Sequence, residues 1–150
     1  MRGKVSAVRM LLAASLCACT LAGCVGGRKN QATKEVNKEI EATLKEVHAF
    51  TGEVVRRVES AADPSAGVDD AQKYFEEKRP EIKSKIDSLR KINDADLSEE
   101  TRGKKMESLM DDLMSVNSLQ IKFMTNAMNG AVFKSKLEKL LNDYRALVDV

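Results

Sequence analysis

The sequence predicts an all-α protein, an elongated antiparallel (up-down) four-helix bundle, on three observations. From residue 33 onward, apolar residues recur at steps of three and four, the period of a helix that buries one face. No stretch alternates apolar and polar residues as a half-buried strand does. Short turn signals separate the periodic stretches, and short connections favour antiparallel neighbours. A three-helix bundle with a separate C-terminal helix stays the alternative.

The first expected helix covers residues 33–61. Its apolar row is Val36, Ile40, Leu44, Val47, Val54 and Val58, with Thr51 in the same row. From Ile40 the steps are four and three in turn, which keeps the row on one face of the helix. Residues 63–67 (Asp-Pro-Ser-Ala-Gly) are expected to form a turn that ends the first helix, because proline and glycine are the strongest turn signals.

The second expected helix covers residues 68–93 and has Pro80 in its middle. Its row is Val68, Ala71, Phe75, Ile82, Ile86 and Leu89. Proline removes one backbone hydrogen bond, so the helix either kinks or restarts with Pro80 in its first turn. Because the row resumes in phase at Ile82, we expect one kinked helix.

The third expected helix begins at its N-cap Ser98 and continues to Met128, where Asn129-Gly130 ends it. Its expected core row is Met106, Leu109, Leu113, Val116, Gln120, Phe123 and Ala127, widened by Met110, Met114, Ile121 and Met124. The fourth helix runs to about Val148 through Phe133, Leu137, Leu140, Tyr144 and Leu147.

The methionines of the third helix allow three interpretations. Met106, Met110 and Met114 recur every four residues, and so do Met124 and Met128. We expect them to fill the core beside the leucines. Thioethers at this spacing could also form an adaptable surface for partner helices or lipids, or bind Cu(I), which prefers soft sulfur ligands.

The N-terminus has the layout of an export signal. Three basic residues, Arg2, Lys4 and Arg9, precede an apolar run over residues 10–22. The run is shorter than the ~20 residues of a transmembrane helix, so a retained anchor helix is the weaker interpretation. It ends in Leu21-Ala22-Gly23-Cys24. This tetrapeptide resembles the lipobox of bacterial lipoproteins, and the resemblance covers residues 1–24.

The resemblance implies cleavage between Gly23 and Cys24 and lipid attachment at Cys24. Residues 1–23 would then be the removed signal peptide, residues 24–32 the lipidated cysteine with a flexible tether, and residues 33–150 the helical domain. Two or three acyl chains anchor a protein firmly, whereas one binds only marginally. The implied location is the bacterial cell envelope. Val25 stands where inner-membrane lipoproteins tend to carry Asp, which favours the outer membrane.

Charge and cysteine content narrow the function. The chain has 25 Lys and Arg against 23 Asp and Glu, net +2, and losing residues 1–23 leaves 22 against 23, net −1. A nucleic-acid binder normally carries a dominant basic surface, so no nucleic-acid partner is expected. Cys17 and Cys19 lie in the removed segment, and with Cys24 acylated no free thiol remains.

No catalytic residue, metal site or cofactor is expected, and the chain is not expected to be an enzyme. His48 is the only histidine and has no second histidine or cysteine to act with, so we expect a surface or boundary position. Haem held by His48 and a methionine is a remote alternative. Adjacent acidic pairs point about 100° apart on a helix, and we expect solvated positions for Asp69-Asp70, Glu76-Glu77, Glu99-Glu100 and Asp111-Asp112.

Basic residues also gather around the turn between the second and third helices. They are Lys83, Lys85, Arg90, Lys91, Arg102, Lys104 and Lys105. In an up-down bundle this turn lies at the anchored end, where cations could rest on anionic headgroups. Acidic neighbours favour a solvated surface instead.

The sequence therefore predicts a non-enzymatic, membrane-anchored lipoprotein whose helical bundle binds an envelope or host partner. One alternative is a carrier or sensor that holds an apolar ligand or lipid in the bundle. Another is a pilotin-like assembly factor, for which no shared motif is present.

Overall fold

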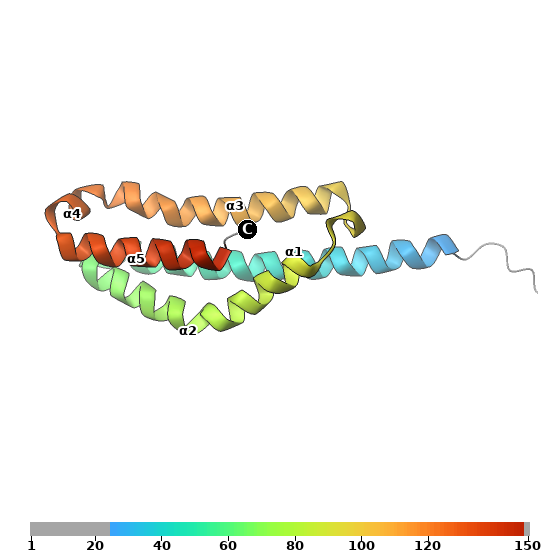
Figure 1. Cartoon of the computed structure of the whole chain (residues 1–150), viewed down its shortest axis with the longest axis horizontal. Coiled ribbons are helices and arrows are strands. Elements are labelled where there is room, and N and C mark those ends of the chain that lie inside the picture. The colour runs from blue at the N-terminus through green and yellow to red at the C-terminus, as the bar shows by residue number, and fades with distance from the viewer. Residues whose placement is uncertain (1–24, 149–150) are drawn as a thin grey trace, which may run out of the picture.

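A computed structural model describes residues 25–148 of the chain, and its side chains over residues 34–95 and 97–148. The helices are α1 (Val25–Glu59), α2 (Pro64–Lys91), α3 (Glu99–Lys122), α4 (Met124–Asn129) and α5 (Ala131–Val148), with a 3₁₀ turn at Asp94–Asp96 (Figure 1). Within residues 25–148 there is no strand, which confirms the all-α class. The signal sequence and Cys24 lie outside the described residues.

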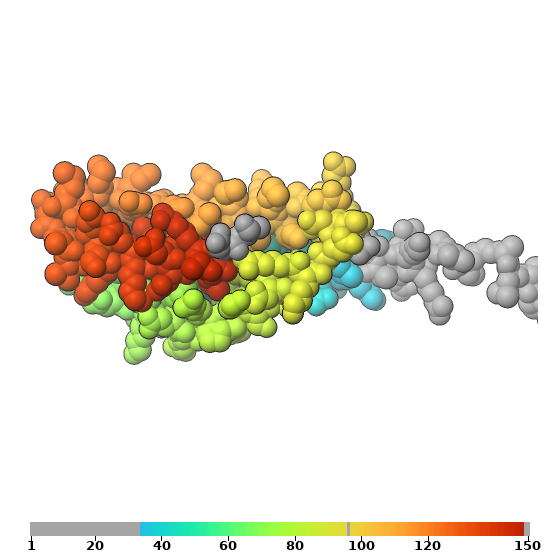
Figure 2. Space-filling model, viewed as in Figure 1, coloured from blue at the N-terminus to red at the C-terminus, as the bar shows by residue number. Residues whose placement is uncertain are grey.

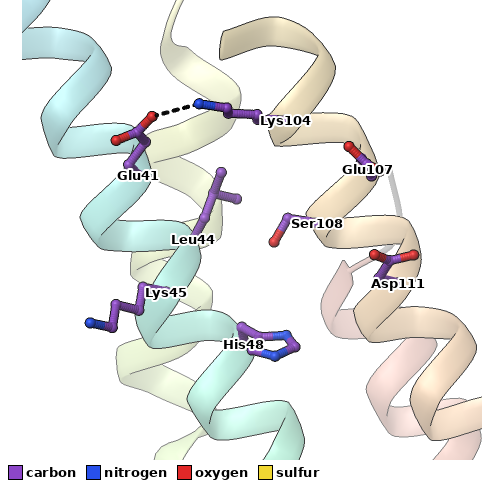
Figure 3. Close-up of a pocket in the computed structure, with 8 residues that line it drawn as sticks. All are labelled: Glu41, Leu44, Lys45, His48, Lys104, Glu107, Ser108 and Asp111. Atoms are coloured by element: carbon purple, nitrogen blue, oxygen red, sulfur yellow. Dashed lines mark hydrogen bonds and ion pairs between the residues drawn. The ribbon is translucent and has the colours of Figure 1, made fainter. Parts of the chain in front are cut away.

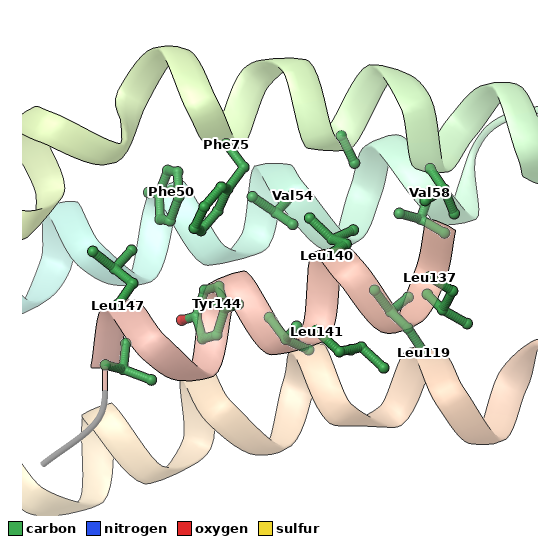
Figure 4. Close-up of a cluster of buried hydrophobic side chains, with 14 of the residues drawn as sticks. Phe50, Val54, Val58, Phe75, Leu119, Leu137, Leu140, Leu141, Tyr144 and Leu147 are labelled. Atoms are coloured by element: carbon green, nitrogen blue, oxygen red, sulfur yellow. The ribbon is translucent and has the colours of Figure 1, made fainter. Parts of the chain in front are cut away.

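The long helices pack as a bundle. α1 lies against α2 and α3, α5 lies against the same two helices, and α4 packs on α5 (Figure 1). The main core gathers between α1, α2 and α5, where Phe50, Phe75 and Tyr144 bring their rings within 5.9–6.4 Å of one another (Figure 4). α5 buries seven residues, whereas the longer α3 buries only four. α3 therefore gives less of its surface to the core than any other long helix with described side chains.

The first two helices begin earlier than expected. α1 starts at Val25 instead of Thr33, so residues 25–32 continue the helix. α2 starts at Pro64, because Asp63 caps it by accepting a hydrogen bond from the backbone N–H of Ser65. Proline fits the first turn of a helix, where its missing N–H is not needed. The segment expected to form a turn, residues 63–67, is thus the N-cap and first turn of α2.

Pro80 lies inside α2 and does not divide it, as the phase of its row predicted. The helix bows along its length in Figure 1, which agrees with a proline-induced bend. On both sides of Pro80 the predicted row is buried, from Val68 and Phe75 to Ile82 and Leu89.

The expectation of one helix from Ser98 to Met128 is wrong. Ser98 does cap α3, since its hydroxyl accepts a hydrogen bond from the N–H of Thr101. α3 ends at Lys122, its C-cap Phe123 has φ −104° and ψ 18°, and α4 follows at Met124. The ring of Phe123 lies 5.9 Å from that of Phe133 on α5. Gly130 ends α4 near the predicted position.

Candidate functional site

The methionines of α3 and α4 lie on the surface, so the expected core packing is wrong. Seven large apolar side chains on α3, α4 and the start of α5 are 52–79% exposed. They are Met106, Met110, Met114, Ile121, Met124, Met128 and Val132. We call these residues the α3 face.

The core side of α3 is a different row. Leu109, Asp112, Val116 and Leu119 follow at steps of three and four, with Val116 and Leu119 almost fully buried. At 100° per residue, this row and the methionines lie on opposite sides of the helix. α3 is therefore apolar on two faces, and only one of them is used by the described chain.

Exposed apolar residues of this number are comparable to the largest apolar patch of a typical monomer, about 300–600 Å², and such patches are often functional. α3 runs along the edge of the bundle, and its outer side forms part of the molecular surface (Figures 1 and 2). Arg102 and Glu107 line one part of the α3 face together with Met106 and Met110. The surface therefore has the composition of a protein contact, an apolar centre with charged edges.

A second candidate site is a groove of about 430 Å³ between α1 and α3 (Figure 3). His48 stands at one end of it. The lining residues are Glu41, Leu44, Lys45, His48, Lys104, Glu107, Ser108 and Asp111. Its charges are mixed, and Lys104 is ion-paired to Glu41 across the groove.

His48 is exposed, as predicted, but it has a buried partner. Nδ1 of the ring lies 2.7 Å from Oδ1 of Asp112, whose side chain is fully buried. With its proton on Nδ1, the neutral imidazole donates to the carboxylate. The expectation that Asp111 and Asp112 are both solvated is therefore wrong for Asp112. The other three acidic pairs are exposed as expected.

The surroundings of Asp112 disfavour its charge. Burial raises the pKa of its carboxyl above the ordinary value, and the hydrogen bond from His48 opposes part of this effect. Its Oδ2 is buried and has no hydrogen-bond partner among the described residues. Asp112 is thus a buried carboxyl group that accepts a hydrogen bond from His48, and the nearby Thr51 hydroxyl also opposes the rise in its pKa.

A second buried polar contact lies beside it. The hydroxyl of Thr51 on α1 is 2.6 Å from the phenol oxygen of Tyr144 on α5. The same Thr51 hydroxyl is 3.0 Å from the backbone oxygen of Val47 and donates to it. Burial raises the pKa of Tyr144 well above its ordinary value. Together with Asp112, these groups join α1, α3 and α5.

The groove offers one oriented imidazole. A buried carboxylate behind a histidine fixes which ring nitrogen carries the proton, as in many acid–base and metal sites. Among the described residues, no group of three or more His, Cys, Asp or Glu side chains is placed to hold a metal ion. The polar core of Asp112, Thr51 and Tyr144 was missed by sequence reasoning, because a pattern search counts Asp as a surface residue.

A small apolar pocket borders the α3 face where α4 meets α5. Its volume is about 190 Å³, below the ~300–1,000 Å³ of typical small-molecule sites. Leu137 and Leu141 of the core are among its lining residues, with Met124 and Met128. This pocket is the nearest feature to the expected apolar-ligand site.

The basic cluster at the second turn is largely neutralised within the chain. Lys85 pairs with Glu46, and Lys105 pairs with Asp94 at 2.7 Å. Lys104 contacts two carboxylates, and Lys83 binds Asp87. These contacts favour the solvated-surface interpretation over a membrane-binding patch.

Comparisons with protein-family models, curated proteins and solved structures found no match for this chain. Within the part of the chain that the structure describes, no helix is long and apolar enough to cross a membrane.

Proposed function

We propose that this chain is a lipid-anchored, non-enzymatic protein of the bacterial envelope that acts by binding another protein through the α3 face. The anchor rests on Leu21-Ala22-Gly23-Cys24, with the lipid on Cys24. The residue after it, Val25, favours the outer membrane. The binding role rests on the α3 face.

One observation supports the binding role: the large apolar side chains of the α3 face are exposed to water. Each such side chain gains about 1.5–3 kcal/mol when it is fully buried. The bundle leaves Met106, Met114 and Ile121 more than half exposed. Methionine is flexible and polarizable, which suits a surface that adapts to a partner helix.

An elongated up-down bundle fits this role. In Figure 1, α2 returns along α1, and α5 returns along α3. α1 begins at the same end of the bundle as the turn between α2 and α3 and projects beyond it (Figure 1), so an anchor there would leave the rest of the bundle extending from the membrane. The α3 face would then lie along the side of the anchored protein.

The carrier alternative has less support. All five methionines of the α3 face are more than half exposed, and the apolar pocket at α4 and α5 is small. A lipid chain would need the helices to separate. Co-purified lipid in native mass spectra would favour the carrier over the binding protein.

Two measurements test the proposal. Cells that express the full chain are fed labelled palmitate; the wild type should incorporate it, and Cys24→Ser should not. The wild-type protein should also co-purify with one stoichiometric protein from its own membranes, and Met110→Glu should lose it. Ala42→Glu, an exposed apolar-to-acidic change on α1, is the matched control and should keep it.

The two halves of the proposal can fail separately. Equal label in wild type and Cys24→Ser would refute the lipid anchor at that residue. Equal recovery of the partner by Met110→Glu and Ala42→Glu would show that the α3 face is not the binding surface.

A further inference from the structure

We propose that the α3 face binds a second copy of this chain, with the two α3 helices parallel and related by a two-fold axis along them. This inference rests on the proposed use of the α3 face as a protein-contact surface and names its occupant.

The spacing along α3 suits a helix–helix seam. The outward positions Gly103, Met106 and Met110 repeat 11 residues later as Met114, Asn117 and Ile121. An 11-residue repeat averages about 3.67 residues per turn, near the ~3.6 of a straight helix. The row therefore stays on one side of α3 over its length. In a parallel pair, every member of the row meets its own copy.

The available area suits a dimer. A side chain of this size covers about 60–120 Å² of apolar surface when fully buried, so the partly exposed α3 face offers on the order of 300–550 Å². Homodimer interfaces are roughly 65% apolar. The corresponding total is about 460–850 Å² per partner, and its upper end reaches the ~800 Å² of a standard interface.

Charges beside the row favour the parallel direction. Arg102 and Glu107 are five residues apart and lie on opposite sides of the row. In a parallel pair, Arg102 of each copy lies beside Glu107 of the other, as the flanking positions of a coiled coil do. Neither side chain makes a hydrogen bond or an ion pair within residues 34–95 and 97–148, and Arg102 acts only at a distance on Asp94.

In an antiparallel pair of α3 helices, the charges beside the row would repel each other. This arrangement places the same flank of both helices together, so Glu107 and Asp111 of one copy face the acidic flank of the other. Lys104 and Lys122 share this flank, but both are already ion-paired within the chain, Lys104 to Glu41 and Glu100 and Lys122 to Glu59. A parallel pair also keeps the two N-termini at one end, as two chains anchored in one membrane require.

A lipid surface is a poorer occupant. Helices that lie in a membrane interface carry Lys and Arg beside their apolar face, which attract anionic headgroups. Beside the methionines, this chain places Glu99, Glu107 and Asp111 together with Arg102, so the charged edge is mixed and net acidic. A net acidic edge attracts anionic headgroups less than a basic one does.

Cysteine cross-linking in native membranes tests the arrangement on the full chain. Met106→Cys, Met110→Cys and Met114→Cys, introduced singly, should each form a disulfide-linked dimer under mild oxidation. Lys73→Cys, exposed on α2, should not, and the wild-type chain reports any linkage through its own cysteines. An antiparallel pair would link only a position next to the two-fold axis, and that result would overturn the parallel arrangement.

Charge exchange tests the same contact while the cysteine at position 110 is kept the same in every variant. On the Met110→Cys background, Arg102→Glu and Glu107→Arg should each lower the dimer fraction about fivefold. The double variant should restore it. Equal dimer in all four proteins would exclude the proposed pairing of these two residues.

The outcomes separate this inference from the proposed function. If none of the three cysteine variants cross-links while Met110→Glu still loses another captured protein, the dimer is refuted and the binding role stands. If Met110→Glu, added to the Met106→Cys variant, leaves cross-linking unchanged, and Met110→Glu alone leaves capture unchanged, both are refuted.

Discussion

Nδ1 of His48 lies 2.7 Å from Oδ1 of Asp112 and joins α1 to α3. The two partners have opposite surroundings, because the Asp112 side chain is fully buried while that of His48 is 67% exposed. The hydrogen bond therefore joins a side chain in contact with solvent to one in the core. Any change at this pair is expected to act on the stability of the bundle.

The pH dependence of stability should carry the signature of Asp112. Its pKa is raised in the folded state, so the folded chain holds this proton more tightly than the unfolded chain. The contribution of the group to stability is then full below the unfolded pKa and is lost as pH rises through the folded pKa. Relative to wild type, Asp112→Asn should gain stability over that interval, measured by urea unfolding from pH 3 to 7.

The neighbouring substitution Asp111→Asn is the control for this experiment. Asp111 is exposed, so its removal should leave the difference from wild type nearly flat with pH. A flat difference for Asp112→Asn as well would contradict a raised pKa at that position.

The hydrogen bond between Thr51 and Tyr144 should respond unequally to its two deletions. Thr51→Val leaves the buried phenol without its partner and should cost about 1–3 kcal/mol. Tyr144→Phe leaves Thr51 donating to Val47 and should cost about 0.5–1.5 kcal/mol. Thermal or urea unfolding of both variants and of the double variant measures the coupling. Equal losses would show that Thr51 does not satisfy Tyr144.

Gly67 should not tolerate a methyl group. A Cβ there would lie 2.6 Å from Cβ of Ala61 and 3.0 Å from the backbone oxygens of Arg57 and Val58. Because backbone cannot move aside freely, Gly67→Ala should destabilise the protein by about 1–3 kcal/mol. Gly52→Ala has open space and should instead stabilise α1 by about 0.5–1 kcal/mol. Unfolding midpoints that shift in the same direction would contradict the close approach of α1 and α2.

The rotation of α3 can be checked with two truncations. Leu119 is fully buried, so Leu119→Ala should cost about 2–5 kcal/mol. Met114 is mostly exposed, and Met114→Ala should change the stability of the dissociated chain by less than ~0.5 kcal/mol. The comparison is made by denaturant unfolding at low protein concentration. A larger loss for Met114→Ala would place the methionines in the core.

Periodicity predicted the helices that have one apolar face. The rows of α1, α2 and α5 are buried as the sequence indicated, from Val47 and Phe75 to Leu140. Turn chemistry was less informative, since Asp63-Pro64 can end one helix or begin the next. The structure shows that Asp63 begins α2, because its side chain accepts a hydrogen bond from the backbone N–H of Ser65. Such a cap depends on side-chain geometry.

The same method failed on α3, because that helix has two apolar faces. A pattern search favours the row without charges, and the buried row contains Asp112. Only the three-dimensional packing of His48 beside it shows why a carboxyl group is tolerated there. The exposed methionine row was therefore assigned to the core. Nothing in the sequence indicated that this row forms a surface, because its residues are apolar.

The five methionines that follow Cys24 all belong to the α3 face. Oxidants convert exposed methionine to its sulfoxide, which is polar, and reductases reverse the change. No methionine is buried in the part of the bundle with described side chains, so oxidation would alter the contact surface and spare the core. If the α3 face is a contact surface as proposed, the division of apolar residues, with thioethers outside and hydrocarbons inside, would make association more sensitive to oxidation than folding is.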